Sequence, residues 1–271
     1  MSNGRPTKHK SDTRTVRHSA PRGGPLTRQL AALEQRAAGA PLPCFGERLA
    51  RLFDLSDTVS LDAANVPLRD GHFSADENAA ERLRGELDKL ARKQREAIEA
   101  SVSAECIGTR NGLPVPEAGP SAVEPPDFEP YQRFYQGRQR QLAAAVPPLR
   151  LRARGALTDY SPALARLAQI DAVFEATLAG YGRRGFGALP GVLEKRFHAL
   201  WPDRQHSLLA EAPGDTPQDW MKEGAWLHCF CQEMKQMLLA ELDTRLEPVR
   251  GLLDALDNAR NGEGHHQEGH Q

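Results

Sequence analysis

The sequence contains few cysteines, few aromatic residues and no long apolar run. Its 4 cysteines among 271 residues, Cys44, Cys106, Cys229 and Cys231, are too few and too irregularly spaced for a disulfide framework. No run of about 20 uncharged apolar residues is present, so no segment is expected to cross a bilayer. The residues before Pro21 lack the apolar stretch of a secretory signal. These absences predict a soluble cytoplasmic protein with reduced thiols.

The sequence also lacks the residue patterns of catalysis and metal binding. It contains no paired-histidine zinc motif and no nucleophile elbow. His228, Cys229 and Cys231 are zinc-binding residue types, but helix positions two apart face different directions and cannot share one ion. The run Arg184–Gly187 matches the opening of an RNA-recognition signature, yet no strand pattern surrounds it, so we interpret it as a loop between helices. We therefore predict a non-enzymatic protein with no cofactor, metal site or small-molecule substrate.

Helical periodicity fills most of the chain, in blocks separated by proline and glycine. With 39% hydrophobic residues, 23 Gly and 20 Pro, the composition suits helices joined by flexible segments. We predict an all-α fold, a helical bundle with long coiled-coil-like helices. The predicted organisation is a disordered basic tail (1–24), an N-terminal helical region (25–107), a Pro-rich linker (108–128), a C-terminal helical bundle (129–257) and a flexible histidine-containing tail (258–271).

The N-terminal region is predicted to end in its longest helix. A short helix is expected from Pro25, and two small helices within residues 45–63. Ser74 and Glu77 form a capping box, so the long helix is predicted to begin there and to run to about Glu105. Its apolar residues alternate spacings of three and four, which is the pattern of a heptad repeat.

The C-terminal region is predicted to be a series of helices delimited by proline and glycine. Pro130 occupies a first helical position, and Pro147 and Pro148 break or kink that helix. Further helices are predicted to about Leu157, from Pro162 to Gly180, from about Leu189 to Trp201, and from near Trp220 onward.

The leading functional interpretation rests on apolar ridges along the longest helices. A helix whose apolar stripe is wider than its own chain can cover tends to pair with another, so we predict homo-oligomerisation or docking on a partner protein, as in a scaffold. The same leucines would also pack within one chain, and both interpretations stay open. The residues assigned to this seam are Leu83, Leu87, Leu90, Leu238, Leu242, Leu246 and Leu253.

A second interpretation uses positive charge. The N-terminal tail is basic, and six arginines lie beside Tyr131, Phe134 and Tyr135, a mixture that binds nucleic acid or an anionic surface through phosphate contacts and stacking. Solvated helix faces have the same composition, which is the structural alternative. The arginines are Arg133, Arg138, Arg140, Arg150, Arg152 and Arg154.

Several stretches of the sequence resemble one protein family. They are FGERLARLFDLSDTVSL, DFEPYQRFYQGRQRQL followed by PLRLRAR, YSPALARLAQIDAVFE, and LLAELDTRLEPVRGLLDAL. Together they span most of residues 26–256, in the family's order, and resemble the proteobacterial family known as domain of unknown function 3348. Where this chain has GYGRRGFG, residues 180–187, relatives read as plain helix.

The resemblance implies helices throughout the chain and supplies no activity, cofactor or catalytic residue. Genes of the family often lie beside genes for envelope proteins of the outer-membrane-protein-A type and for inner-membrane proteins similar to proton-driven motor stators. The resemblance therefore implies a cytosolic accessory of a bacterial cell-envelope complex.

Overall fold

The structure, a computed structural model, describes residues 24–34, 59, 62–63, 73–74, 76, 78–118, 126–208 and 216–267. Nearly all of the predicted basic tail lies outside these residues, as do the small helices predicted within 45–63, isolated positions apart. The described residues form helices and no strand, which confirms the all-α prediction. Within this part of the chain, no helix has the length and apolarity that a membrane span requires.

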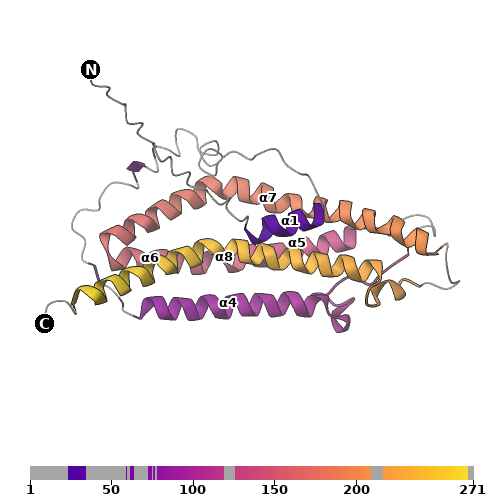
Figure 1. Cartoon of the computed structure of the whole chain (residues 1–271), viewed down its shortest axis with the longest axis horizontal. Helices are drawn as coiled ribbons and strands as arrows, with labels where there is room; N and C mark the ends of the chain where they lie inside the picture. Colours follow the sequence, from indigo (N-terminus) through magenta and orange to yellow (C-terminus); the bar gives the residue numbers. More distant parts are fainter. Residues whose placement is uncertain are drawn as a thin grey trace, which may run out of the picture.

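Figure 1 shows the described helices in chain order. They are α1 (Pro25–Glu34), α4 (Ala79–Val102), the 3-10 helix η1 (Ala104–Cys106), α5 (Glu129–Ala145), α6 (Pro147–Tyr160), α7 (Pro162–Leu208), the 3-10 helix η2 (Asp219–Met221) and α8 (Trp226–Gln267).

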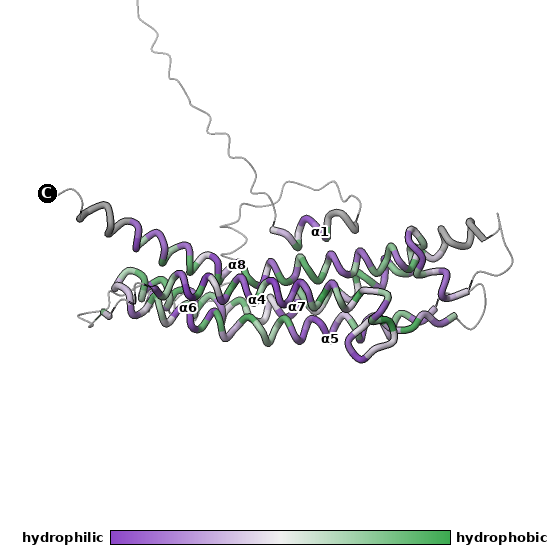
Figure 2. Tube along the Cα trace, turned by 90° about the horizontal axis from the view of Figure 1, so that it is seen from below, coloured by the Kyte–Doolittle hydropathy of each residue, from purple (hydrophilic) through white to green (hydrophobic). Residues whose placement is uncertain are grey.

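Helix α8 is the centre of an elongated bundle. Helices α4, α5, α6 and α7 all pack against it, and α1 packs on α8 from the side away from α5 (Figures 1 and 2). The buried residues form one apolar cluster that includes Leu87 of α4, Leu157 of α6, Leu193 of α7 and Leu242 of α8. The helices thus contribute apolar faces to this cluster, and most of their charged residues lie on the outer faces, with buried exceptions such as Arg138 and Glu241.

The predicted N-terminal and C-terminal regions share this core. Helix α4 lies along α8 and also contacts α6. Arg84 of α4 forms ion pairs with Asp254 and Asp257 of α8. The first part of the predicted linker is folded onto the bundle as well, since Leu113 is fully buried. The proline-rich segment thus joins two regions that pack together.

Helix α4 is shorter than predicted. It begins at Ala79 instead of Ser74 and ends at Val102, where Ser103 turns the backbone into an extended conformation. The carboxylate that lies near its first turn belongs to Asp76, which accepts the Asn78 amide at 3.0 Å. This Asx-type contact competes with a longer helix, because it satisfies the backbone in a turn.

The largest departure from the sequence prediction is α7. We predicted two helices, the first ending at Gly180 and the second starting near Leu189, but α7 is continuous over its whole range. None of its glycines has a positive φ, so the backbone stays in the right-handed helical region. Each glycine costs a helix about 1 kcal/mol relative to alanine, and the packing of buried residues such as Leu164 and Leu193 outweighs this cost.

A hydrogen bond from α5 replaces the one that α7 loses at Pro190. Proline has no N–H, so the carbonyl of Phe186, four residues earlier, has no donor within the helix. The side-chain amide of Gln139 donates to this carbonyl at 2.9 Å, and also to the buried carboxylate of Glu241 at 2.8 Å. Arg245 donates two bonds to Glu241 and stacks over the Phe186 ring, 3.9 Å from its centroid. Side chains of α5 and α8 therefore keep α7 intact where its own sequence favours a break.

Helix α8 starts and ends later than predicted. Trp220 lies in η2, and α8 begins only at Trp226, after a turn at Gly224 with φ of 82°. The helix then runs to Gln267, past residue 258 where the flexible tail was predicted to start, and Ala259 still packs against the core. A polar sequence can extend a helix that has already formed, because propagation adds one hydrogen bond for each residue fixed.

Candidate anion-binding site

The leucines predicted to form an interaction seam lie in the core of the same chain. Leu83, Leu87, Leu238, Leu242, Leu246 and Leu253 are each at most 5% exposed, and Leu90 is partly buried against the same cluster. Helices α4 and α8 pack directly on each other, so their apolar stripes cover one another. The structure therefore shows packing within one chain, and these residues offer no exposed ridge to a partner.

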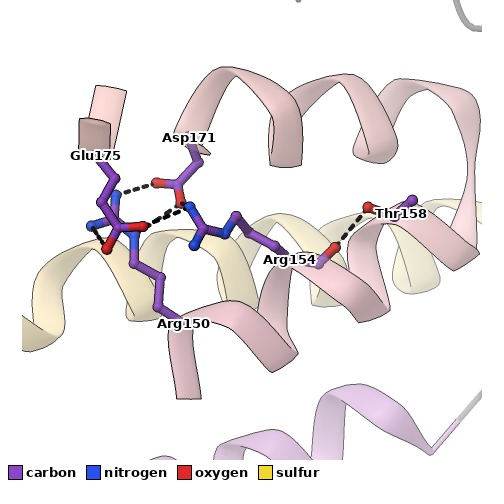
Figure 3. A network of polar contacts seen from close by, with 5 residues as sticks. All are labelled: Arg150, Arg154, Thr158, Asp171 and Glu175. Carbon is purple, nitrogen blue, oxygen red and sulfur yellow. Dashed lines mark hydrogen bonds and ion pairs between the residues drawn. The ribbon is translucent and has the colours of Figure 1, made fainter. Parts of the chain in front are cut away.

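The six arginines predicted as one cluster separate into two regions. On α6, Arg150 and Arg154 point toward α7 and its two carboxylates, Asp171 and Glu175 (Figure 3). Arg150 binds Asp171 through two hydrogen bonds of 2.9 and 2.6 Å, and Arg154 lies 2.7 Å from Glu175. These groups are largely buried: the side chains of both arginines and of Asp171 are 13–16% exposed. They form a closed network, which we call the α6–α7 network, and it has no charge left to offer an external anion.

The third arginine of α6 is also paired inside the protein. Arg152 lies 2.6 Å from Glu86 of α4, on a more exposed surface. The prediction of one anion-binding cluster is therefore wrong for the three arginines of α6. Their charges serve contacts between helices.

The three arginines of α5 border a shallow depression. It lies between α5 and the loop that follows η1, and its volume is about 340 Å³. A fourth arginine, Arg110, enters it from the loop. We call this the arginine depression, and it is lined by Arg110, Asn111, Gly112, Pro114, Pro130, Arg133, Phe134, Gly137, Arg138, Arg140 and Gln141.

Two glycines shape the loop that carries Arg110. Gly108 has φ of 77°, in the left-handed region that side chains disfavour. A Cβ at Gly112 would lie 1.6 Å from the Cys106 carbonyl oxygen, so only glycine fits there. The Gly108 amide donates to the carbonyl of the buried Leu113 at 2.7 Å, which anchors the turn to the core. The loop thus holds Arg110 beside α5 in a defined place.

Arg138 is a buried cation without a carboxylate partner. It is only 8% exposed, and it donates to two neutral acceptors, the Gln141 side-chain oxygen at 3.0 Å and the Asn111 carbonyl. No ion pair joins it to a carboxylate of the described chain. Burial lowers the pKa of its guanidinium from the ordinary value. Because buried charges in proteins are normally paired, a buried guanidinium with neutral partners makes this depression a candidate site for an anion.

The remaining arginines of the depression add uncompensated charge. Among the described residues, Arg110 and Arg140 have neither an ion pair nor a hydrogen-bond partner, and Arg140 is exposed. Arg133 lies 3.1 Å from Glu129, one turn earlier, with both side chains at least 60% exposed. An exposed pair of this kind contributes little and is easily exchanged. The depression therefore presents three to four positive charges against one carboxylate at its edge.

Apolar groups lie between these charges. The ring of Phe134 is half-buried, with the Arg138 guanidinium 5.7 Å from its centroid. At Gly137 a Cβ would meet nothing nearer than the Arg140 guanidinium at 3.9 Å, so packing does not require a glycine there. Its bare backbone leaves open space between Arg133 and Arg140, which are about 10 Å apart along the helix axis.

The thiol and imidazole groups of α8 do not form a comparable site. Cys231 is fully buried, and burial raises the pKa of its thiol. Cys229 donates through Sγ to the Gly224 carbonyl at 3.6 Å, and His228 accepts the Gly224 amide at 3.4 Å. Across the described residues, no three His, Cys, Asp or Glu side chains are grouped as metal ligands would be.

Sequence reasoning identified Arg133, Arg138 and Arg140 but missed Arg110. This residue lies in the segment predicted as an extended linker. The dipeptide Asn111-Gly112 beside it is a turn signal, which would have predicted a tight loop. The loop folds back onto α5 because of tertiary contacts. No local pattern in the sequence could therefore predict that Arg110 belongs to the site.

Comparison with known proteins identifies a family and nothing narrower. No curated protein and no solved structure matches the chain significantly. The family described as "Protein of unknown function (DUF3348)" matches residues 13–258 of the 271, which covers all of the helices from α1 to α7 and most of α8. The chain therefore belongs to the DUF3348 family, as its sequence resemblance predicts.

Proposed function

We propose that this protein is a non-enzymatic binding protein that holds nucleic acid at the arginine depression. The observation that carries the proposal is Arg138, a buried guanidinium with neutral protein partners only. Arg110, Arg133 and Arg140 surround the same depression. A phosphate there would receive several charge-assisted hydrogen bonds and compensate the buried charge.

Nucleic acid suits this surface because it combines regularly spaced negative phosphates with flat bases, and the surface combines arginines with apolar side chains. Binding would release counterions from the phosphates, which is the main source of sequence-independent affinity. The sequence adds a second source of positive charge in the residues before α1, namely Arg5, Lys8, Lys10, Arg14, Arg17 and Arg22. Helix α1, which follows these basic residues, packs on the side of α8 away from α5 (Figures 1 and 2). The depression can therefore be altered without changing α1 or its contacts with α8.

Fewer observations support the alternative, that the protein binds a protein partner. The leucines on which homo-oligomerisation or docking on a partner protein was predicted lie in or against the chain's own core, whereas the envelope-complex prediction rests on the family resemblance alone. Large apolar residues exposed on the described surface are scattered, at Val59, Val115, Leu151 and Tyr181. A coiled-coil contact with a second chain would need another surface than the one predicted.

The test is a salt-titrated binding assay with matched charge variants of the full chain. The probe is a fluorescent oligonucleotide of about 20 nucleotides, longer than a typical single-strand site. We expect the affinity of the unmodified protein to fall steeply between about 50 and about 200 mM salt. The variant Arg110→Gln/Arg140→Gln should bind about tenfold or more weakly, with the logarithmic salt slope reduced by about 1 to 2.

The control variant is Arg82→Gln/Arg92→Gln, which removes the same charge from α4. Both of these arginines are exposed, with side chains 59% and 69% accessible. The proposal predicts that this control binds within about twofold of the unmodified protein, since only distant charge is lost. Equal losses for both variants would show unspecific attraction and contradict a site at the depression. Polyglutamate that competes as strongly as the oligonucleotide would indicate an acidic protein partner instead.

We also propose a cytoplasmic location. The described cysteines, Cys106, Cys229 and Cys231, are free thiols, as is usual in a reducing compartment. Cell fractionation, with thiol labelling before and after reduction, tests this. Recovery of the protein in an exported fraction would contradict it.

A further inference from the structure

The arginine depression combines charge with a set of flat apolar surfaces. Phe134, Pro114 and Pro130 line it together with the four arginines. Simple anions such as phosphate or an acidic side chain have no use for such surfaces. A nucleotide has both parts, because its phosphate is anionic and its base is a flat aromatic ring that stacks on aromatic side chains.

The size of the depression suits one nucleotide unit. Its volume of about 340 Å³ is at the lower end of pockets that hold small ligands. A duplex keeps its bases stacked inside the helix, and extruding one costs a few kcal/mol. A single strand presents its bases without this cost, so it can place a phosphate on the arginines and a base in the depression at once.

The floor of the depression leaves room for this arrangement. Gly137 lies one turn from Arg133 and less than one turn from Arg140, and it has no side chain to fill the space between them. Phe134 lies on the same stretch of α5, and the Arg138 guanidinium lies over its ring, 5.7 Å from the centroid. Because Phe134 also lines the depression, its ring offers a stacking surface beside the charged groups.

We infer that the arginine depression binds single-stranded nucleic acid, with one base stacked against Phe134 and the adjoining phosphate bound by Arg138 and its neighbouring arginines. The inference rests on the proposed nucleic-acid binding and names the form of its ligand. In this inference, stacking on Phe134 makes the affinity for a strand with bases higher than the affinity for an abasic strand.

The test compares a thymidylate oligomer with an abasic oligomer of the same length, at equal salt. The two have the same phosphates, so arginine contacts alone would bind them equally. We expect the unmodified protein to bind the thymidylate oligomer about 5- to 100-fold more tightly, as one stacked base contributes. The variant Phe134→Leu should lose this preference and keep its affinity for the abasic oligomer, because leucine preserves an apolar contact to the core but cannot stack.

The matched control is Tyr181→Leu. Tyr181 is an exposed aromatic residue that also stacks with an arginine: it is 41% exposed, with the Arg184 guanidinium 4.6 Å from its ring centroid. The inference predicts an unchanged preference for thymidylate in this variant. It also predicts that a duplex of the same length binds more weakly than the thymidylate oligomer.

The outcomes separate the two proposals. Equal binding of thymidylate and abasic oligomers, both lost in Arg110→Gln/Arg140→Gln, would leave the depression as a phosphate site and overturn the single-strand inference. A preference that survives in Phe134→Leu, or that disappears in Tyr181→Leu, would also overturn it. The absence of any oligonucleotide binding would remove both proposals. Because the oligomer comparison uses the unmodified protein, the result does not depend on how well a variant folds.

Discussion

The two arginine regions of this protein differ in whether carboxylates of the same chain neutralise the arginines. In the α6–α7 network, Arg150 and Arg154 have two carboxylates within reach, at 2.6 to 3.5 Å (Figure 3). In the arginine depression, Arg138 is buried still more deeply and has only neutral acceptors. Arginines in the first region are therefore neutralised by carboxylates of the same chain, whereas Arg138 in the second has only neutral partners, and there we propose an external anion as the counter-charge.

The comparison shows why a cluster of arginines in sequence is a poor guide to a binding site. Arg150 and Arg138 are twelve residues apart on consecutive helices, and both are largely buried. Only the acidic residues opposite them differ. Asp171 and Glu175 lie one turn apart on α7 and face α6, while no carboxylate of the described chain pairs with Arg138.

The strongest test of the comparison is Arg150→Gln. This change removes the two hydrogen bonds that Arg150 donates to Asp171 and leaves Arg154 as the remaining cation for both partly buried carboxylates, so we expect the free energy of unfolding to fall by about 2–4 kcal/mol. Urea denaturation measures it. The matched control is Arg152→Gln, whose partner Glu86 is 39% exposed, and which should cost less than about 1 kcal/mol. Similar small losses for both changes would mean that the network is not structural.

A second test removes a neutral donor of α5 that bonds α7 and α8 instead of lining the depression. Gln139 lies on α5 between Arg138 and Arg140, yet its amide bonds the Phe186 carbonyl of α7 and Glu241 of α8. Gln139→Leu leaves both acceptors without this donor, so we expect a loss of about 1–3 kcal/mol in urea denaturation. Hydrogen exchange of the α7 amides around Pro190 should accelerate. Unchanged exchange would show that α7 does not depend on this bond.

A third test makes the same substitution in the depression as in the network. Arg138→Gln removes an unpaired buried cation, and the shorter side chain leaves the Asn111 carbonyl to water in the open depression, so the stability should change by less than about 1 kcal/mol in either direction. Oligonucleotide binding should weaken about tenfold or more. Arg150→Gln, assayed at a temperature where it is folded, should bind as the unmodified protein does. The comparison fails if Arg138→Gln destabilises as much as Arg150→Gln.

A fourth test gives Arg138 a carboxylate partner within the protein. Gln141 accepts a hydrogen bond from Arg138 at 3.0 Å, so Gln141→Glu places a carboxylate beside the unpaired guanidinium. We expect a gain in stability of about 0.5–1 kcal/mol and a clear loss of oligonucleotide affinity. Thermal denaturation and the binding assay measure the two effects on one sample. Retained affinity would show that Arg138 does not contact the ligand.

The smallest expected effect belongs to Gly137→Ala. Alanine is the better helix former by up to about 1 kcal/mol, and its methyl group would meet no atom nearer than 3.9 Å, so the variant should be slightly more stable. The same methyl group enters the arginine depression, so oligonucleotide binding should weaken about two- to fivefold. A variant that is more stable and binds equally well would place the ligand elsewhere in the depression.

Much of the helical architecture was predictable from local signals. The prolines at residues 25, 147 and 162 occupy first positions of α1, α6 and α7, because their missing N–H is not needed there. The apolar periodicity of α4 and α8 marked Leu87 and Leu242 as interior residues of some interface. Three of the four arginines in the depression were identified on charge alone.

The errors came from places where another helix supplies what the local sequence lacks. Local reasoning breaks α7 at its glycines and at Pro190, because it cannot include the hydrogen bond that Gln139 donates from 47 residues away. It also left open whether the leucines of α4 and α8 contact an outside partner or pack within one chain, because it could not know that the two helices pack on each other.

The amino-acid sequence by itself determined the fold class, most helix starts and the supply of basic residues, since these depend on periodicity, capping and composition over a few turns. Tertiary structure decided which arginines are neutralised and which remain open. That division depends on which side chains face one another across helices distant in sequence, as Asp171 faces Arg150 while the Asn111 carbonyl faces Arg138.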